Sequence, residues 1–233
     1  MEHPPEHSDD LVLREEHLTD AGLDAIPHPF WRGFVASFEA AIAGVLRTVA
    51  TQRNMKIHTT SALMVMLVGM ALPLDLATRA ALIFAIAMVM FAEILNTALE
   101  AVVDLFIGTY NRLAMLTKDA AAAGVLILAV AAVVVFSDII IVNWELVTQN
   151  LDQVWRFTTL GIPVVLAQAI ILFGPRKGWL PRVSLLIALG CLVPLIANSF
   201  DPTFSAGAVL VLLTSVLART RFPGRMPHGA PKR

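Results

Sequence analysis

The chain has 233 residues, of which 57% are hydrophobic and only 15% are charged, and its mean hydropathy is +0.74. Soluble domains carry roughly 25% charged residues, so this composition excludes an ordinary soluble enzyme and indicates an integral membrane protein. A single cysteine, Cys191, excludes an internal disulfide framework. The net charge of −1 indicates nothing about partners until it is divided by region, and we expect no nucleic-acid partner.

The first 28 residues form an acidic segment, with eight carboxylates against one arginine, Arg14. We predict a mostly disordered cytoplasmic tail here. From residue 30 to residue 52, apolar residues recur at three- and four-residue spacing, among them Phe34, Phe38 and Ile42. This pattern predicts an amphipathic helix that lies in the membrane interface.

Six apolar segments follow. They cover residues 57–74, 80–107, 120–142, 158–173, 183–199 and 204–217. The first three approach or exceed the ~20 residues that cross a hydrocarbon core, and the last three are shorter. With the N-terminus in the cytoplasm and six crossings, fifteen basic residues lie inside and only Arg79 and Arg156 lie outside. The sequence therefore predicts an all-α polytopic membrane protein with a surface helix, three spans, about three further spans and cytoplasmic termini.

The second of these segments carries a polar stripe. Glu93, Glu100 and Asp104 follow thirteen uncharged residues. At 100° per residue Glu100 and Asp104 lie within about 20° of Glu93, one on each side, and Asn96 lies about 60° to one side. Ionisable groups at bilayer depth cost ~2.5–3.5 kcal/mol each on insertion scales, so they indicate a function. Lys118 and Asp119 open the third segment from the same predicted cytoplasmic side. We expect all of these groups to converge at that membrane surface.

Residue types alone leave three chemistries open. Carboxylate and amide oxygens suit Mg²⁺, and a nearby lysine can neutralise phosphate, as phosphoryl transfer requires. The stripe could equally form a cation pathway or a proton relay. No G-x-x-x-x-G-K-[ST] or G-x-G-x-x-G motif is present, so a nucleotide would not be held by a familiar phosphate loop.

The stretch E-I-L-N-T-A-L-E-A-V-V-D at residues 93–104, followed after thirteen residues by K-D-A-A-A-A, resembles the signature of the prokaryotic diacylglycerol kinase and undecaprenol kinase family. The resemblance covers about residues 30–142. It implies a small integral membrane enzyme of the bacterial inner membrane, trimeric, with active sites completed by a neighbouring subunit. It also implies ATP as co-substrate, Mg²⁺ as cofactor and a membrane lipid alcohol as acceptor.

The same resemblance assigns roles to individual residues. Glu93 would be the general base facing the lipid hydroxyl and Asn96 would orient substrate or phosphate. Glu100 would ligate Mg²⁺ together with position 52. The remaining implied contacts are Asp104, Lys118, Asp119 and Arg32 for the nucleotide, and Arg53 and Asn54, beside Glu93, for the lipid.

This chain departs from the family pattern at several of these positions. Gln52 stands where a second metal-binding glutamate is expected, and an amide oxygen can ligate Mg²⁺ but brings no negative charge. Asn111 stands where a histidine is frequent, and small residues replace basic ones in the surface helix, at Gly33, Ala36 and Ala43. Arg32, one residue out of register, could substitute for one of them.

We expect four parts in the chain: an acidic tail over residues 1–28, a lipid kinase-like membrane domain over 29–142, a three-span extension over 143–218 and a basic cytoplasmic tail over 219–233. The extension has no counterpart in the minimal family and contains no catalytic or metal-spaced motif. The leading interpretation is an ATP- and Mg²⁺-dependent kinase that phosphorylates diacylglycerol or undecaprenol at the cytoplasmic leaflet. The alternatives are an inactive membrane scaffold or lipid-binding protein of the same fold, and an ion or proton carrier.

Overall fold

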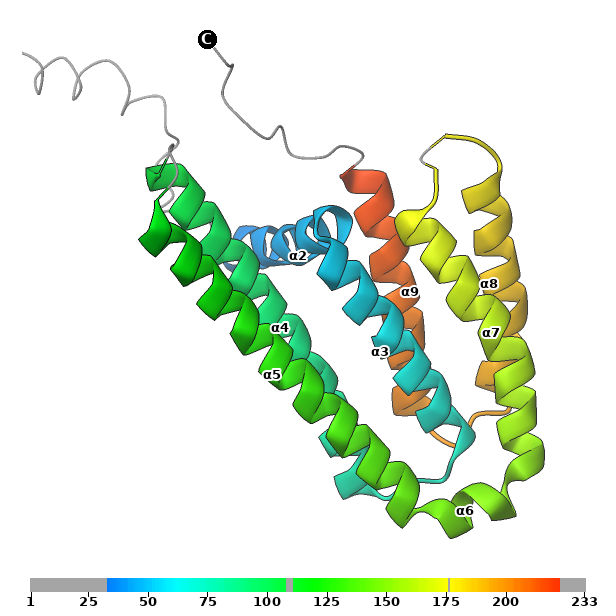
Figure 1. The fold of residues 1–233 in the computed structure, drawn as a ribbon. Coiled ribbons are helices and arrows are strands. Elements are labelled where there is room, and N and C mark those ends of the chain that lie inside the picture. Colours follow the sequence, from blue (N-terminus) through cyan, green and yellow to red (C-terminus); the bar gives the residue numbers. More distant parts are fainter. Residues whose placement is uncertain (1–32, 108–110, 176, 223–233) are drawn as a thin grey trace, which may run out of the picture. The chain divides into compact units, whose positions relative to one another are not determined.

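The computed structural model describes residues 33–107, 111–175 and 177–222, and within them every regular element is a helix (Figure 1). The predicted acidic tail, Arg32 and all but the first few residues of the basic tail lie outside the described residues. The helices are α2 (Phe34–Thr51), α3 (Arg53–Ala71), α4 (Leu76–Phe106), α5 (Arg112–Val142), α6 (Trp144–Gln149), α7 (Leu151–Phe173), α8 (Leu180–Ala197) and α9 (Pro202–Arg221). By its contacts the chain divides into two units, residues 1–42 and residues 43–233.

Six described helices are long and apolar enough to cross a membrane: α2, α4, α5, α7, α8 and α9. Five of them coincide with segments expected to span. The sixth is α2, which the sequence places at the interface, whereas α3, expected to span, is not among the six. The first turns of α3 are polar, with Arg53 and Lys56, but the hydroxyls of Thr59 and Thr60 donate to backbone carbonyls four residues back, at 2.7 and 2.9 Å. The prediction of an all-α polytopic membrane protein is confirmed.

The first unit contributes only the start of α2 to the described chain. There the apolar side chains Phe34, Val35 and Phe38 are largely exposed, and the rings of Phe34 and Phe38 stack with centroids 6.5 Å apart. The remainder of α2 belongs to the second unit and ends at Thr51. Gln52 is extended, with φ −85° and ψ 128°, so the chain changes direction before α3 begins.

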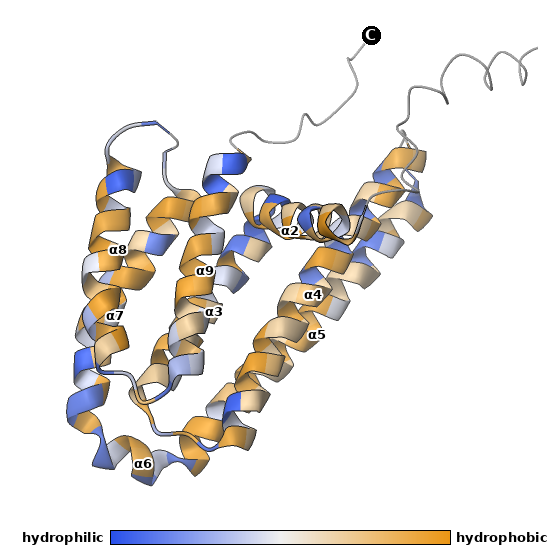
Figure 2. Cartoon of the chain, turned by 180° about the vertical axis from the view of Figure 1, so that it is seen from behind, coloured by the Kyte–Doolittle hydropathy of each residue, from blue (hydrophilic) through white to orange (hydrophobic). Residues whose placement is uncertain are grey.

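The core of the second unit surrounds α3. Buried side chains of α3, including Leu63 and Met70, pack with residues of α7, α8 and α9 such as Val164, Leu195 and Phe204. Figure 2 shows apolar residues along the length of the helices, and hydrophilic residues gathered at helix ends and around α6. The predicted extension therefore packs against α3 as part of one helical unit with α3–α5.

Small residues allow α3 and α9 to approach closely. A Cβ added to Gly69 on α3 would lie 2.6 Å from the ring of Phe204, and one added to Gly207 on α9 would lie 2.6 Å from the sulfur of Met66. Helices in membranes associate through packing of this kind, because lipid supplies no hydrophobic driving force between them. Helices α3 and α9 are thus in close contact at two positions along their length.

Polar contacts add to this packing. Arg79 at the start of α4 forms an ion pair with Asp201, whose other oxygen caps α9 by accepting from Thr203 and Phe204 N–H at 2.7 and 3.1 Å. Deeper in the bundle the Gln168 side-chain amide of α7 donates to Ser215 Oγ of α9 at 2.9 Å. Both contacts are in or next to the buried core, so they fix which faces meet.

Helices α4 and α5 form a long hairpin that contacts the rest of the unit mainly through α3. Asp75 caps α4 by accepting from the backbone N–H of Thr78 at 2.9 Å and from its hydroxyl, and these bonds hold the pKa of the Asp75 carboxyl below its usual range. Only 6% of the most apolar window of α5 is buried. One face of the hairpin is therefore left for lipid or for another chain.

Candidate active site

The polar stripe lies on α4, and burial within the protein falls along it. Glu93 and Asn96 are buried, with 2% and 6% of their surface exposed, Glu100 is half-buried and Asp104 is exposed. At 1.5 Å per residue the stripe is about 16 Å long. It therefore connects the protein interior with the end of the α4–α5 hairpin.

Two oxygens at the buried end have no hydrogen-bond partner among the described residues. These are Oε2 of Glu93 and Oδ1 of Asn96. The amide nitrogen of Asn96 donates to Oε1 of Glu100 at 3.0 Å, which orients the carboxamide. Buried acceptors without partners cost about 1–3 kcal/mol each, so a site that leaves two of them one turn apart is suited to a donor or a cation that is not part of the chain.

At the exposed end of the stripe an ion pair connects α4 and α5. Lys118 Nζ contacts Oδ1 of Asp104, which brings together two residues fourteen positions apart in the sequence, as the spacing predicts. Asp119 follows on α5 and is exposed. Asn111 caps α5 by accepting from the N–H of Leu113 at 2.8 Å, which gives this departure from the family pattern a structural role.

The junction between α2 and α3 packs against the turn of α4 that carries Glu93. Met90 and Ile94 of α4 contact the cluster built by Val49 and Met55 on either side of Gln52. The side chain of Gln52 makes no capping bond to α3, and Arg53 and Asn54 are exposed. Arg32 lies outside the described residues, so the structure does not place it relative to the stripe.

Two contacts between a cation and an aromatic ring, near the α2–α3 junction, could not be predicted from the sequence pattern. Lys56 lies over the ring of Phe173 in the extension, 5.7 Å from its centroid, and Arg47 lies over Phe222 at 5.4 Å. No spacing rule pairs residues so far apart in the chain. Asn111 is different, because an Asn directly before a helical pattern is a cap signal that the sequence already carries.

The donor set fits a Mg²⁺ ion that arrives with a nucleotide. Within the described residues no three His, Cys, Asp or Glu side chains lie close enough to form a metal centre. Mg²⁺ is commonly held by one or two carboxylates and by substrate phosphates, with waters completing the shell. Glu100, with the free amide oxygen of Asn96 one turn away, supplies hard oxygens of the kind required.

The stretch that carries this site is similar to known proteins. A family model described as prokaryotic diacylglycerol kinase matches residues 39–140, which include the whole stripe and Lys118. A diacylglycerol kinase of Synechocystis sp. is 46% identical over 102 residues, 43% of this chain and 58% of that protein. An undecaprenol kinase of Bacillus subtilis is 33% identical over 102 residues, 44% of this chain and 83% of that protein.

A diacylglycerol kinase of Escherichia coli is 40% identical over 72 residues, 31% of this chain and 59% of that protein. The chain therefore spans less than two thirds of the length of two of these three relatives. No solved structure matches the chain. The relatives' names indicate lipid kinases, and together with the apolar helices they indicate a bacterial membrane protein.

Proposed function

This chain belongs to the prokaryotic diacylglycerol kinase family, and on that premise we propose that it transfers the γ-phosphoryl group of ATP to the hydroxyl of a membrane lipid alcohol at the cytoplasmic leaflet. The observation that carries the proposal is the continuous stripe on α4, with free buried oxygens at Glu93 and Asn96 at one end and the Asp104–Lys118 pair at the other. Lipid and nucleotide would meet between these ends.

In the proposed reaction Glu93 accepts the proton of the lipid hydroxyl. The hydroxyl oxygen then bonds to the γ-phosphorus as the bond to the β–γ bridging oxygen breaks, which leaves ADP and a lipid phosphate. Lys118 would exchange Asp104 for phosphate oxygens and offset their charge, while Asn96 would orient the acceptor. Mg²⁺, when bound by Glu100, would neutralise charge on the phosphates.

Gln52, Arg53, Asn54, Asp119 and Arg32 remain proposed contacts. Gln52 lies at the N-terminal end of α3, where a family glutamate would sit at the positive end of the helix dipole. Its neutral amide favours a weakened kinase or, as the second candidate function, an inactive membrane scaffold. A homotrimer whose neighbour completes the site is also proposed, and the bare apolar face of α5 is compatible with it.

The test is phosphate transfer from labelled ATP by detergent-purified protein, offered dioleoylglycerol and undecaprenol separately. Glu93→Gln removes the proposed base without changing side-chain size, and Gln52→Glu restores the metal charge. Asp138→Asn, at the far end of α5, is the matched control. We expect transfer by the wild type and the control and none by Glu93→Gln. Silence from the wild type with recovery in Gln52→Glu would favour a scaffold, and silence from every variant would refute the kinase.

A further inference from the structure

Two apolar cavities follow one another along α3. The inner cavity, of about 300 Å³, is bounded by α3, α4 and α5 and includes His58, Met90 and Phe136. The outer cavity, of about 440 Å³, is bounded by α3, the far half of α5, and by α6 and α7 of the extension, and it too includes Phe136. The shared phenylalanine places the two cavities end to end.

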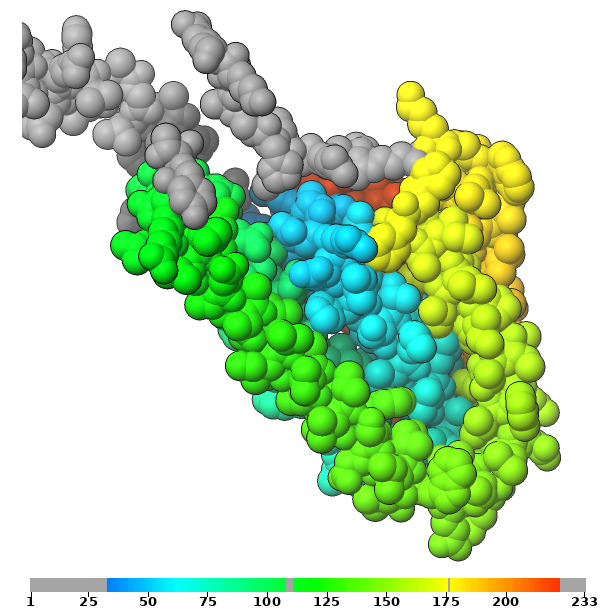
Figure 3. Space-filling model, in the orientation of Figure 1, coloured from blue at the N-terminus to red at the C-terminus, as the bar shows by residue number. Residues whose placement is uncertain are grey.

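On α3 the two cavities adjoin along one edge and together form a groove. At 100° per residue, Ile57 and Ser61 of the inner cavity and Val68 and Leu72 of the outer cavity fall within about 60° of one another. Figure 3 shows α3 at the surface between α5 and α7, so the groove lies on a face that lipid can reach. From Ile57 to Leu72 it extends about 22 Å along the helix.

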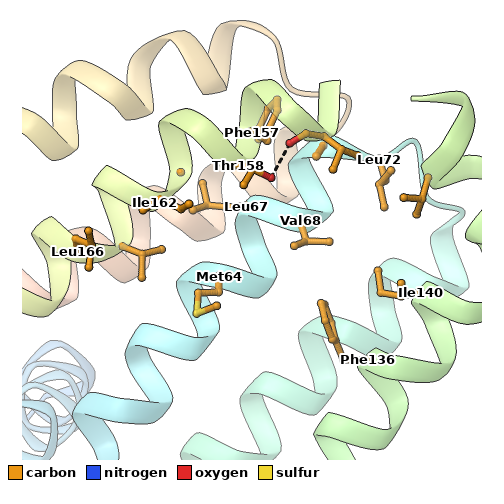
Figure 4. A pocket seen from close by; sticks show the side chains of 15 residues that line it. Met64, Leu67, Val68, Leu72, Phe136, Ile140, Phe157, Thr158, Ile162 and Leu166 are labelled. Atoms are coloured by element: carbon orange, nitrogen blue, oxygen red, sulfur yellow. Dashed lines mark hydrogen bonds between the residues drawn. The ribbon is translucent and has the colours of Figure 1, made fainter. Parts of the chain in front are cut away.

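The outer cavity is built for hydrocarbon. In Figure 4, Met64 and Val68 of α3 face Phe136 and Ile140 of α5, with Ile162 of α7 on the third side. Its one hydroxyl, on Thr158, donates to the backbone carbonyl of Val154 at 2.8 Å and so offers no free donor. A ligand group in this cavity must therefore be apolar.

The inner cavity ends about one turn of α4 from the candidate active site. Met90 precedes Glu93 by three residues on α4, and the polar lining residues of this cavity, His58 and Ser61, lie on α3 toward the same end. An alcohol whose hydroxyl meets Glu93 would thus enter the groove with its hydrocarbon chain first turning into the inner cavity and then passing Phe136.

The length of the groove discriminates between lipids. A hydrocarbon core is ~30 Å thick, so a chain confined to one leaflet reaches about 15 Å, less than the groove. We infer that the outer cavity, which is lined in part by the extension, binds the distal part of a long polyprenyl chain. This inference rests on the proposed kinase activity. The extension then sets chain-length specificity, and diacylglycerol leaves the outer cavity unused.

The first test compares undecaprenol with geraniol, a prenol too short to reach the outer cavity, as acceptors. Val165→Phe fills the outer cavity from α7, and Val193→Phe makes the same change at an exposed position of α8 that lines neither cavity. Val165→Phe should lower the ratio of undecaprenol to geraniol turnover about tenfold, and Val193→Phe should leave it unchanged. An unchanged ratio in an active Val165→Phe protein would overturn the inference. A change in oligomeric mass without a change in the ratio would also overturn it, because it would assign the outer cavity to a second copy of the chain.

A second test needs no turnover. In a Cys191→Ala background, Ile162→Cys places a thiol in the outer cavity, and its alkylation by a membrane-permeant maleimide is followed. Undecaprenol should slow alkylation several-fold, while geraniol and dioleoylglycerol should not. Protection without any kinase activity would separate failure of the proposed function from failure of this inference. Activity without protection would refute the binding site and leave the kinase intact.

Discussion

The ion pair between Arg79 and Asp201 connects α4, inside the region shared with the relatives, to α9 of the extension. The Asp201 side chain is 6% exposed and that of Arg79 is 29% exposed, so the exposure of this ion pair is intermediate between that of a surface pair and that of a buried pair. Surface pairs contribute up to about 1 kcal/mol, and removing one partner of a buried pair costs about 3–5 kcal/mol. We expect Asp201→Asn to lower the free energy of unfolding by about 2 kcal/mol.

Asparagine is the informative replacement because it keeps an oxygen that can still cap α9. The loss then reports the charge pair and not the two capping bonds from Thr203 and Phe204. Arg79→Met should cost about as much, since it leaves the carboxylate buried. The double variant should lose clearly less free energy of unfolding than the sum of the two single losses, because removing both charges leaves neither of them buried without its partner.

Unfolding can be followed through Cys191, the one cysteine of the chain, which is half-buried in α8. Its alkylation rate in increasing denaturant reports when the extension opens. Arg156→Met is the control, since Arg156 also contacts the α8–α9 connection, at Asn198 Oδ1 and 3.1 Å, but is exposed, and it should change stability by less than about 0.5 kcal/mol. Strictly additive losses, or losses no larger than the control's, would refute the docking argument.

Three further outcomes are expected. Lys118→Met should raise the KM for ATP about tenfold or more in the transfer assay, whereas Asp104→Asn, which frees the lysine, should be milder; equal effects would contradict separate roles. Gly69→Ala should cost about 1–3 kcal/mol in the same unfolding measurement, because its methyl meets a buried ring of α9, and a neutral result would mean that α9 shifts freely. Ser215→Ala should cost about 1 kcal/mol, because it removes the nearer acceptor of the buried Gln168 amide and leaves only the carbonyl of Thr59, at 3.5 Å. Gln168→Leu should cost less, and the reverse order would count against this bond.

Helical periodicity explains what the sequence predicted well. Three carboxylates at offsets of seven and four residues must share a face, and a hairpin of two long apolar segments must bring Asp104 to Lys118, as the structure has it. Hydropathy was less decisive at α2 and α3, because the first turns of α3 carry Arg53, Asn54, Lys56 and His58 ahead of an apolar run. The sequence also begins the fourth span at residue 158, seven residues after α7 begins at Leu151.

The docking of the extension could not be read from the sequence. It depends on which faces meet, and these are chosen by pairs such as Gly69 with Phe204 and Arg79 with Asp201, which no local pattern connects. Every role given to an individual site residue stays a prediction, for Glu93 and Asn96 as much as for Gln52 and Arg32. The chain divisions near residues 28, 142 and 218 also stay predictions.

The way the extension covers α3 has a consequence for engineering a minimal version of this protein. A chain cut near residue 143 would keep the α4–α5 hairpin as it is, but it would strip the cover from Leu63, Met70 and the rest of the buried side of α3. Such a fragment would expose two apolar faces, the uncovered side of α3 and the face of the α4–α5 hairpin, where the full chain exposes only the second. Its self-association would then reflect the missing helices, so the subunit number of a truncated protein is a poor guide to that of the full chain.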